Sequence, residues 1–295
     1  MGIWIRLTLR VLMVNDMQGS LKLQLIELET TGDVQENIRR MQNAVNEKAQ
    51  FVLLPELWNC PYDNTEIRKA AVFGEACRQA MAEAARKNTV WLAGSIPWQD
   101  PADGRIYNMA FVFDADGAEV CRYAKTHLME VHTPHSHYSE AEVFTPGDRF
   151  ETFETPWGKM GILVCYDIRF PEPARILGDA GIRLLLLPAA FNEAVGRKHW
   201  QSLLCARAIE NQIFIAGCNP DYAWGKYKAW GHSLVVSPDG VILQEGSGTV
   251  TLDLSETDRI RQRMPYRKIR RRDLYDRTGC SVSSTGTVRP DRHTG

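Results

Sequence analysis

The stretch Gly161-Ile-Leu-Val-Cys165-Tyr-Asp-Ile-Arg-Phe-Pro-Glu172 combines the features that decide the fold. An apolar segment runs into Cys165, a polar turn follows, and Pro171 marks the first turn of a helix. A strand, a sharp turn and a helix in this order expose a nucleophile at the edge of a sheet. Helix N-terminal dipoles and a cation nearby would lower the pKa of the thiol toward a reactive thiolate. The alternative is a buried, inert cysteine, which is the usual fate of a cysteine in a strand.

Segments of strand and helix character alternate on both sides of this stretch. Apolar runs, polar–apolar alternation and turn residues predict strands at 21–28, 51–54, 89–94, 106–113, 118–124, 159–165, 183–187, 212–217, 234–237 and 241–243. Apolar faces and caps predict helices at 33–45, 67–84, 171–178 and 197–211. Strands that alternate with helices, with hairpins inserted, predict an α/β fold in which helices cover a mixed sheet.

Composition restricts the class of protein. The chain has 295 residues, 44% of them hydrophobic and 24% charged, and a formal net charge of −1. This is the composition of a globular protein with a sizeable core, and the balanced charge gives no reason to expect nucleic acid as a partner. The apolar start, residues 1–14, is interrupted by Arg6 and Arg10, so we expect neither a membrane span nor a signal peptide. Seven cysteines, an odd number, favour free thiols in a reducing, cytoplasmic location.

Two further segments place a reactive side chain after a strand. Glu56 follows the apolar run 51–54 and lies near Trp58 and Tyr62 in sequence. A carboxylate in such surroundings can have a raised pKa, which suits general acid–base chemistry, although a structural carboxylate in a salt bridge or helix cap is the alternative. Lys125 directly follows the strand predicted at 118–124 and could stabilise an oxyanion, with a solvated surface lysine as the alternative.

The three segments share an order and context with a known family. Leu-Pro-Glu-Leu-Trp around Glu56, Tyr-Ala-Lys-Thr-His-Leu around Lys125 and the stretch around Cys165 together resemble the nitrilase superfamily of carbon–nitrogen hydrolases over residues 21–276. The resemblance implies a four-layer αββα sandwich, with two mixed sheets covered by helices. It also implies a homodimer or larger homo-oligomer and no metal or organic cofactor. Residues 1–20 would then be an N-terminal extension, and the Ser-, Thr- and Gly-rich residues 277–295 a flexible tail.

The resemblance also implies roles for individual residues. Cys165 would be the nucleophile, Glu56 the general base, and Lys125 the group that stabilises the tetrahedral intermediate. Glu140, ahead of a Pro-Gly-Asp turn, takes the position of a second catalytic glutamate, and Glu142 is the neighbour that competes for this assignment. The side chains expected to contact substrate are Tyr62, Tyr166 and Phe191.

Further motifs resemble the ω-amidases within this superfamily: Ala190–Asn192, Lys198–Trp200, Ala206–Asn211, Gly231–Ser233 and Met264–Tyr275. The resemblance implies hydrolysis of the terminal amide of a small dicarboxylic acid monoamide, such as α-ketoglutaramate, to acid and ammonia through a cysteine thioester. True nitrilases usually carry tryptophan at the position of Tyr166, which counts against a nitrile substrate. The alternatives are an amidase of deaminated glutathione, an N-carbamoyl amide hydrolase, and a catalytically silent binding module on the same fold.

Two other signals have less weight. His127, His132, His135 and His137 cluster in sequence, the last three in the segment 130–138, which differs from the common ω-amidase version. Imidazoles are good zinc ligands, but their spacing fits no closed site and no cysteine or carboxylate set completes one, so we expect a polar loop near the active site and no metal. The basic run 267–272 is expected to be a solvated segment or a subunit contact, since the chain as a whole is not basic.

Overall fold

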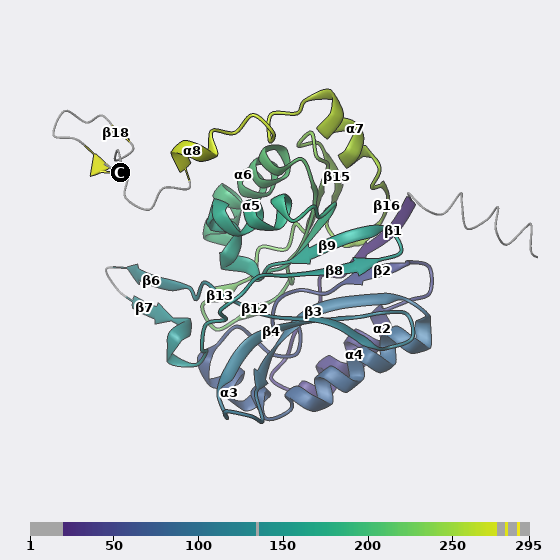
Figure 1. The fold of residues 1–295 in the computed structure, drawn as a ribbon. Coiled ribbons are helices and arrows are strands. Elements are labelled where there is room, and N and C mark those ends of the chain that lie inside the picture. The colour runs from purple at the N-terminus through teal and green to yellow at the C-terminus, as the bar shows by residue number, and fades with distance from the viewer. Residues whose placement is uncertain (1–19, 134–135, 276–280, 283–287, 290–295) are drawn as a thin grey trace, which may run out of the picture.

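The computed structural model describes residues 20–133, 136–275, 281–282 and 288–289. Two six-stranded sheets lie face to face, and helices cover both outer faces (Figure 1). This arrangement confirms the predicted four-layer αββα sandwich. The extension predicted at 1–20 lies outside the described residues apart from Ser20, and so does most of the tail predicted at 277–295.

The first sheet has the strand order β16-β1-β2-β3-β4-β5. Its three central strands are parallel, and the strands outside them join antiparallel. The strands are β1 (Ser20–Leu25), β2 (Phe51–Leu53), β3 (Trp91–Gln99), β4 (Ile106–Phe113), β5 (Glu119–Ala124) and β16 (Gly248–Asp253). The helices on its outer face are α2 (Val34–Ala44), α3 (Asn64–Ala71) and α4 (Gly74–Asn88) (Figure 1).

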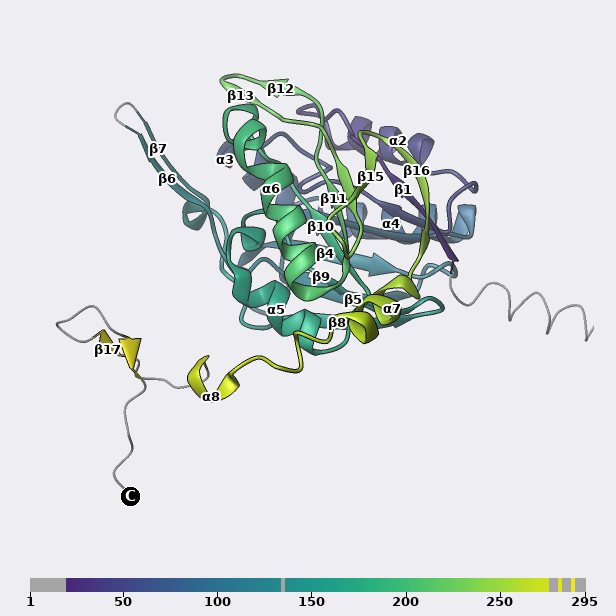
Figure 2. The same ribbon diagram turned by 90° about the horizontal axis from the view of Figure 1, so that it is seen from above.

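The second sheet has the order β15-β14-β11-β10-β9-β8. Here β9, β10 and β11 are parallel, and hairpin-type antiparallel pairs extend both edges. The strands are β8 (Glu151–Thr155), β9 (Gly158–Ile162), β10 (Leu184–Pro188), β11 (Phe214–Cys218), β14 (Leu234–Val236) and β15 (Ile242–Glu245). The helices α5 (Pro171–Asp179) and α6 (Glu193–Asn211) cover its outer face (Figure 2).

The alternation of side chains along the strands separates two apolar layers. In β2, Phe51 and Leu53 belong to the cluster that fills the space between the sheets, whereas Val52 packs under the helices α2 to α4. Successive strand residues point to opposite faces, so a strand in the middle of four layers is apolar on both. Full burial of each such side chain stabilises the fold by about 1.5–3 kcal/mol, which makes this core the main source of stability.

One predicted helix is wrong in its continuity. The apolar spacing over 67–84 predicts one helix, but α3 ends at Ala71 and α4 begins at Gly74. The exposed residues Val72 and Phe73 separate the helices without a proline to mark the break. A β-carbon at Gly74 would lie 3.2 Å from the carbonyl oxygen of Pro97, so α4 begins at a point where the chain passes close to β3. The break is therefore a consequence of packing on the sheet.

The segment 130–138 is a hairpin and not a loop. Its strands β6 (Glu130–Thr133) and β7 (Ser136–Ser139) pair antiparallel and project from the body of the molecule (Figure 2). The polar, histidine-rich composition of this segment concealed its strand character. The first residue after β7 begins a single 3₁₀ turn, η1 (Glu140–Glu142).

The basic run of the C-terminal segment makes ion pairs within the chain. Arg267, Arg270 and Arg272 each lie 2.9–3.1 Å from a carboxylate oxygen of Asp179 at the end of α5. The remaining elements are η2 (Cys165–Arg169), β12 (Ala223–Trp224), β13 (Tyr227–Lys228), α7 (Glu256–Arg263), α8 (Arg272–Tyr275), β17 (Ser281–Val282) and β18 (Val288–Arg289). Among the helices of the described ranges, none has the length and apolar character that crossing a membrane requires.

Candidate active site

Four predicted residues meet between the ends of strands from both sheets. Glu56 follows β2, Lys125 directly follows β5, and Glu140 begins η1. The ammonium group of Lys125 lies between the two carboxylates, with its Nζ 2.8 Å from Oε1 of Glu56 and 2.8 Å from Oε1 of Glu140. All three side chains are fully buried, so the structural alternative of a solvated lysine is wrong.

Cys165 lies on a turn, not at the end of a strand. The predicted strand 159–165 is too long, because the pairing of β9 with β10 stops at Ile162 and η2 begins at Cys165. The backbone of Cys165 has φ 46°, in the left-handed region that side chains with a β-carbon rarely adopt. Such strain persists only where the surrounding structure enforces it, and it is typical of a nucleophile presented on a sharp turn.

Asp167 holds this turn against the segment that carries Lys125. Its Oδ2 accepts hydrogen bonds from the backbone N–H of Val164 at 3.0 Å and from the hydroxyl of Tyr123 at 2.8 Å. Its Oδ1 accepts from the backbone N–H of His127 at 2.9 Å and from the hydroxyl of Thr126 at 3.0 Å. One buried carboxylate therefore ties the cysteine turn to the residues on both sides of Lys125.

The glutamate that faces the cysteine has a raised pKa. Burial is the largest cause, the positive charge of Lys125 acts against it, and the negative charge of Glu140 adds to it. For Lys125, burial alone would lower the pKa, but the charges of Glu140 and Glu56 outweigh it and hold the pKa well above its ordinary value. Lys125 thus stays protonated, and Glu56 is tuned toward proton transfer at a higher pH than an ordinary carboxyl group.

The predicted lowering of the pKa of Cys165 is wrong. Burial raises the pKa of this thiol well above its ordinary value, and the carboxylate of Glu56 raises it further, against the opposite effects of Lys125 and the backbone of Ala190. The sequence prediction considered a helix dipole and a cation but could not include complete burial beside a negative charge. Cys165 is consequently a neutral thiol at rest that needs a base in order to react.

Asn108 is a site residue that the sequence analysis missed. Its side-chain amide donates a hydrogen bond of 2.7 Å to the same Oε1 of Glu56 that binds Lys125. The other oxygen of Glu56, Oε2, has no hydrogen-bond partner among the described residues. Asn108 is a fully buried polar residue within the apolar strand β4, and this exception to the pattern was the available sequence signal.

The geometry distinguishes Glu140 from Glu142. Glu140 is buried, and besides Lys125 it accepts hydrogen bonds of 2.5 Å from the hydroxyl of Tyr62 and from the backbone N–H of Met129. Glu142 is exposed and binds Asn64 at 3.1 Å. Of these two carboxylates, only Glu140 belongs to the buried cluster.

A cavity of about 610 Å³ opens onto Cys165. The three residues predicted to contact substrate, Tyr62, Tyr166 and Phe191, all line it, whereas Glu56, Lys125 and Glu140 lie behind its wall. Arg169 also lines the cavity, with its guanidinium 5.4 Å from the ring centre of Tyr166 and 5.1 Å from that of Phe191. The cavity is thus mostly aromatic and apolar, with a thiol at one end and a cation in its wall.

Known proteins are similar to this chain both in sequence and in fold. The model of the carbon-nitrogen hydrolase family matches residues 20–263. The chain is 37% identical to "Omega-amidase NIT2" of Mus musculus over 273 residues, covering 87% of this chain and 97% of the relative. The structure of Saccharomyces cerevisiae Nit3, a member of branch 10 of the nitrilase superfamily, has a TM-score of 0.76 and 32% identity, covering 86% of this chain and 97% of that one.

A second solved structure carries chemical information. A mutant of the amidase from Nesterenkonia sp. is described as showing covalent addition of the acetamide moiety of fluoroacetamide at the active site cysteine. It has a TM-score of 0.73 and 26% identity, and it covers 88% of this chain and 96% of that one. From the extent of these matches, the present chain belongs to the carbon–nitrogen hydrolase family, within the nitrilase superfamily, and is a hydrolase that acts on carbon–nitrogen bonds.

Proposed function

We propose that this protein is an ω-amidase-like enzyme that hydrolyses the terminal carboxamide of a small dicarboxylic acid monoamide to acid and ammonia. The observation that carries the proposal is the buried cluster of Glu56, Lys125 and Glu140 behind the cavity that opens onto Cys165. The similarity to curated omega-amidases over most of the chain supports the same substrate class. The mechanism needs no metal or organic cofactor.

In the first half-reaction the thiol becomes a nucleophile. Glu56 takes the proton of Cys165, and the sulfur attacks the carboxamide carbon, whose oxygen becomes negatively charged. Lys125 and the backbone N–H of Tyr166 stabilise this oxyanion. The C–N bond then breaks, Glu56 returns the proton to the leaving nitrogen, and ammonia departs from an acyl thioester on Cys165.

In the second half-reaction water replaces ammonia. Glu56 removes a proton from the water while the oxygen attacks the thioester carbon, and the same oxyanion contacts act again. The C–S bond breaks, the acid leaves, and Cys165 regains its proton. Because Oε1 of Glu56 is held by Lys125 and Asn108, the unpartnered Oε2 is the atom that we assign to proton transfer.

Arg169 is the residue that we assign to the carboxylate of the substrate. Among the described residues that line the cavity, Arg169 is the one lysine or arginine. No carboxylate of a described residue lies within ion-pair distance of its guanidinium. Its Nη1 lies 3.2 Å from Nδ1 of His199. An arginine held over aromatic rings and not neutralised by an acid is suited to bind a carboxylate in two-pronged fashion.

A panel of amides with ammonia detection tests the substrate class. The panel contains α-ketoglutaramate, succinamate and deaminated glutathione, and we expect turnover of the first two. Equal low rates for all amides of the panel would contradict the ω-amidase assignment. Release of carbon dioxide together with ammonia would instead identify an N-carbamoyl amide hydrolase. Arg169→Met should raise KM for succinamate at least tenfold but leave KM for the uncharged butyramide within about twofold, because only the former presents a carboxylate.

A matched control is available on α6. Arg197 is exposed on α6 and pairs with Glu193 at 3.1 Å, so Arg197→Met should leave both KM values unchanged.

We further propose a cytoplasmic location, since all six described cysteines are free and Cys165 must remain so. Assembly into a homodimer or larger homo-oligomer is proposed from the family resemblance.

A further inference from the structure

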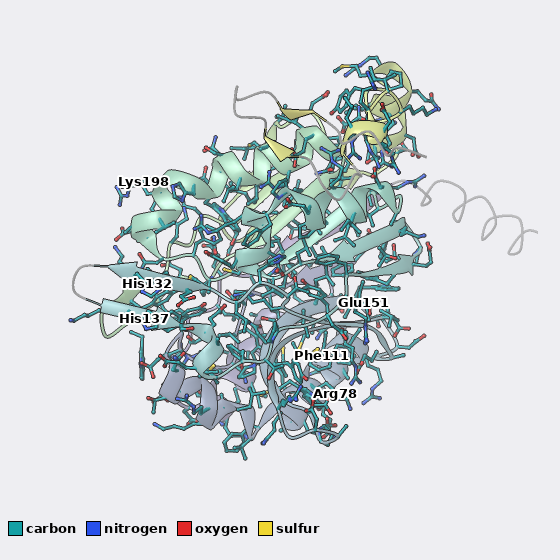
Figure 3. All side chains as sticks on the ribbon, turned by 60° about the vertical axis from the view of Figure 1, so that its left-hand side comes forward. Arg78, Phe111, His132, His137, Glu151 and Lys198 are labelled. Carbon is teal, nitrogen blue, oxygen red and sulfur yellow. The ribbon has the colours of Figure 1, made fainter. Side chains whose placement is uncertain are left out.

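The β6–β7 hairpin carries a convergent set of side chains that the amidase chemistry does not use. Glu130 and His132 alternate along β6 with one residue between them, and His137 is the direct cross-strand partner of His132. Residues at these positions share one face of a two-stranded ladder. Figure 3 shows both histidines on the projecting hairpin, away from Phe111 and Glu151 of the two sheets.

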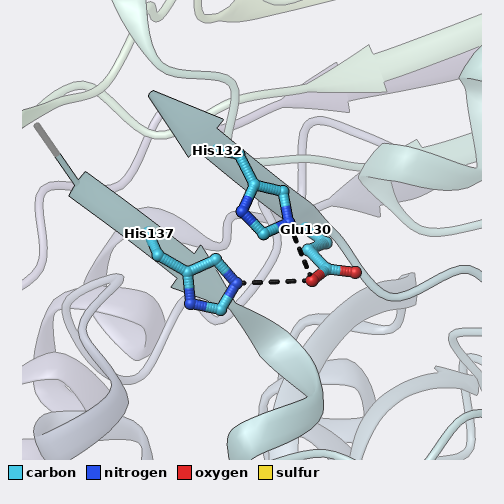
Figure 4. Close-up of side chains that lie close together, drawn as sticks. All are labelled: Glu130, His132 and His137. Carbon is cyan, nitrogen blue, oxygen red and sulfur yellow. Dashed lines mark hydrogen bonds and ion pairs between the residues drawn. The ribbon is translucent and has the colours of Figure 1, made fainter. Parts of the chain in front are cut away.

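The three side chains point their polar atoms at one another. Nε2 of His132 lies 3.0 Å from Oε1 of Glu130, and Nε2 of His137 lies 3.3 Å from the same oxygen (Figure 4). The two imidazole rings are stacked, with centroids 4.5 Å apart and an interplanar angle of 23°, so they present the same edge to the carboxylate. The three ligand atoms all lie within 4.8 Å of one another.

These separations agree with the coordination of a small divalent cation. Bonds of about 2.0–2.2 Å from Zn²⁺ to imidazole nitrogen and carboxylate oxygen put neighbouring ligand atoms of a tetrahedron about 3.3–3.5 Å apart. The two observed distances, 3.0 and 3.3 Å, need to grow by only a few tenths of an ångström or less. The spacing of the histidines and the lack of a completing carboxylate predict no metal, but Oε1 of Glu130 lies 3.0 Å from His132 and 3.3 Å from His137. His135 lies outside the described residues.

We propose that Glu130, His132 and His137 form a binding site for one Zn²⁺ ion per chain, with water as the remaining ligand. Two imidazoles and one carboxylate are a ligand set that zinc accepts readily. All three side chains are exposed, so a cation from solution reaches the site without any rearrangement of the fold. This proposal is independent of the amidase mechanism.

The position of the site gives the cation a structural role. Val131 and Tyr138 are the cross-strand pair on the opposite face of the ladder, and both line the cavity that opens onto Cys165. A cation that joins His132 of β6 to His137 of β7 fastens the two strands directly behind this cavity wall. An isolated two-stranded hairpin is only marginally stable in water, so such a link stabilises it.

The test is a zinc titration followed by calorimetry on chelator-treated, untagged protein at pH 7.5. We expect the wild type to bind one more equivalent of zinc per chain than the double variant His132→Gln/His137→Gln. Because both proteins carry the same cysteines, zinc bound by cysteine thiols does not contribute to this difference. Glu130→Gln should weaken this site at least about tenfold, because the carboxylate that binds the cation is lost.

The control is a second histidine–glutamate pair. His232 lies 2.7 Å from Glu245 on the surface, and among the described residues no second histidine joins this pair. His232→Gln should therefore retain the full stoichiometry. Zinc should also slow hydrogen exchange at 130–133 and 136–139 in the wild type and not in the double variant. Equal zinc stoichiometry in the wild type and a double variant with native circular dichroism would overturn the proposal, as would unchanged exchange.

Discussion

At the scale of the residue, the site is organised around one buried positive charge between two negative ones. Lys125 neutralises only one of the carboxylates Glu56 and Glu140, so a single negative charge remains in a region without water contact. This excess charge contributes to the raised pKa of Glu56. Burial is the largest cause of the raised pKa of Glu56, the proposed base, and the charge of Glu140 adds to it against the opposite effect of Lys125.

Exchanging either glutamate of η1 for glutamine tests this arrangement. Glu140→Gln preserves the shape of the side chain but removes the charge that holds Lys125, and we expect kcat to fall on the order of 10²-fold. Glu142→Gln, two residues away and exposed, should leave kcat within about twofold of the wild type. Equal kcat values for the two variants, measured by ammonia release, would contradict a catalytic contribution of Glu140.

The raised pKa of Glu56 predicts the acid side of the pH profile. Glu56 must be unprotonated to accept the proton of Cys165, so kcat/KM falls as the pH falls through the pKa of Glu56. The midpoint of this limb should lie above 4.5, the ordinary value for a glutamate carboxyl group. In Glu140→Gln the nearby negative charge is gone, so the midpoint should move to lower pH, and a shift in the opposite direction would refute the assignment.

At the scale of the element, the reactive groups stand on turns after strands, and one carboxylate aligns two of these turns. Asp167 accepts hydrogen bonds both from the turn before Cys165 and from the segment around Lys125. The two segments belong to different sheets. Their alignment therefore depends on a buried contact across the sandwich and not on the local geometry of either strand.

Replacement of this carboxylate should affect stability as well as activity. In Asp167→Asn an amide N–H₂ group replaces one carboxylate oxygen, so the hydrogen-bond donors that face this oxygen lose their acceptor. We expect the free energy of unfolding in urea to fall by about 2–4 kcal/mol. Asp103 has an exposed side chain, so Asp103→Asn should lower the free energy of unfolding by less than about 1 kcal/mol. Equal losses for the two variants would show that the Asp167 contacts do not hold the site together.

The sequence predicted most buried elements, and its errors have physical causes. β8 and β16 were missed because they are edge strands in which threonine recurs and no long apolar run occurs. The division into α3 and α4 depends on the close approach of Gly74 to β3, which no local pattern indicates. The hairpin β6–β7 was missed because histidines replace the usual apolar strand residues.

At the scale of the whole molecule, two sheets contribute to one site. β2 and β5 of the first sheet and β9 of the second all end at the cluster of Glu56, Lys125 and Cys165. The sequence predicted this meeting of segments through family motifs, but it could not give the burial that raises the pKa of Cys165. Motifs identify residue types, whereas desolvation depends on everything that packs around them.

The proposed assembly is tested at the same scale. The homo-oligomer implied by the family resemblance should sediment with a mass of at least twice the 33.4 kDa of one chain. We expect this mass to persist on dilution to micromolar concentration, since obligate homo-oligomers bury large apolar interfaces. A sedimentation-equilibrium mass of 33.4 kDa at all concentrations would contradict the proposed assembly but not the catalytic mechanism.

The central claim, that Cys165 carries the acyl group, has one direct measurement. Ammonia release from succinamate is compared between Cys165→Ala and Cys205→Ala, since Cys205 is a free and half-buried cysteine on α6 that takes no part in the site. We predict that Cys165→Ala loses activity by at least about 10³-fold with an unchanged circular dichroism spectrum, and that Cys205→Ala retains wild-type turnover. Substantial ammonia release by folded Cys165→Ala would contradict the account.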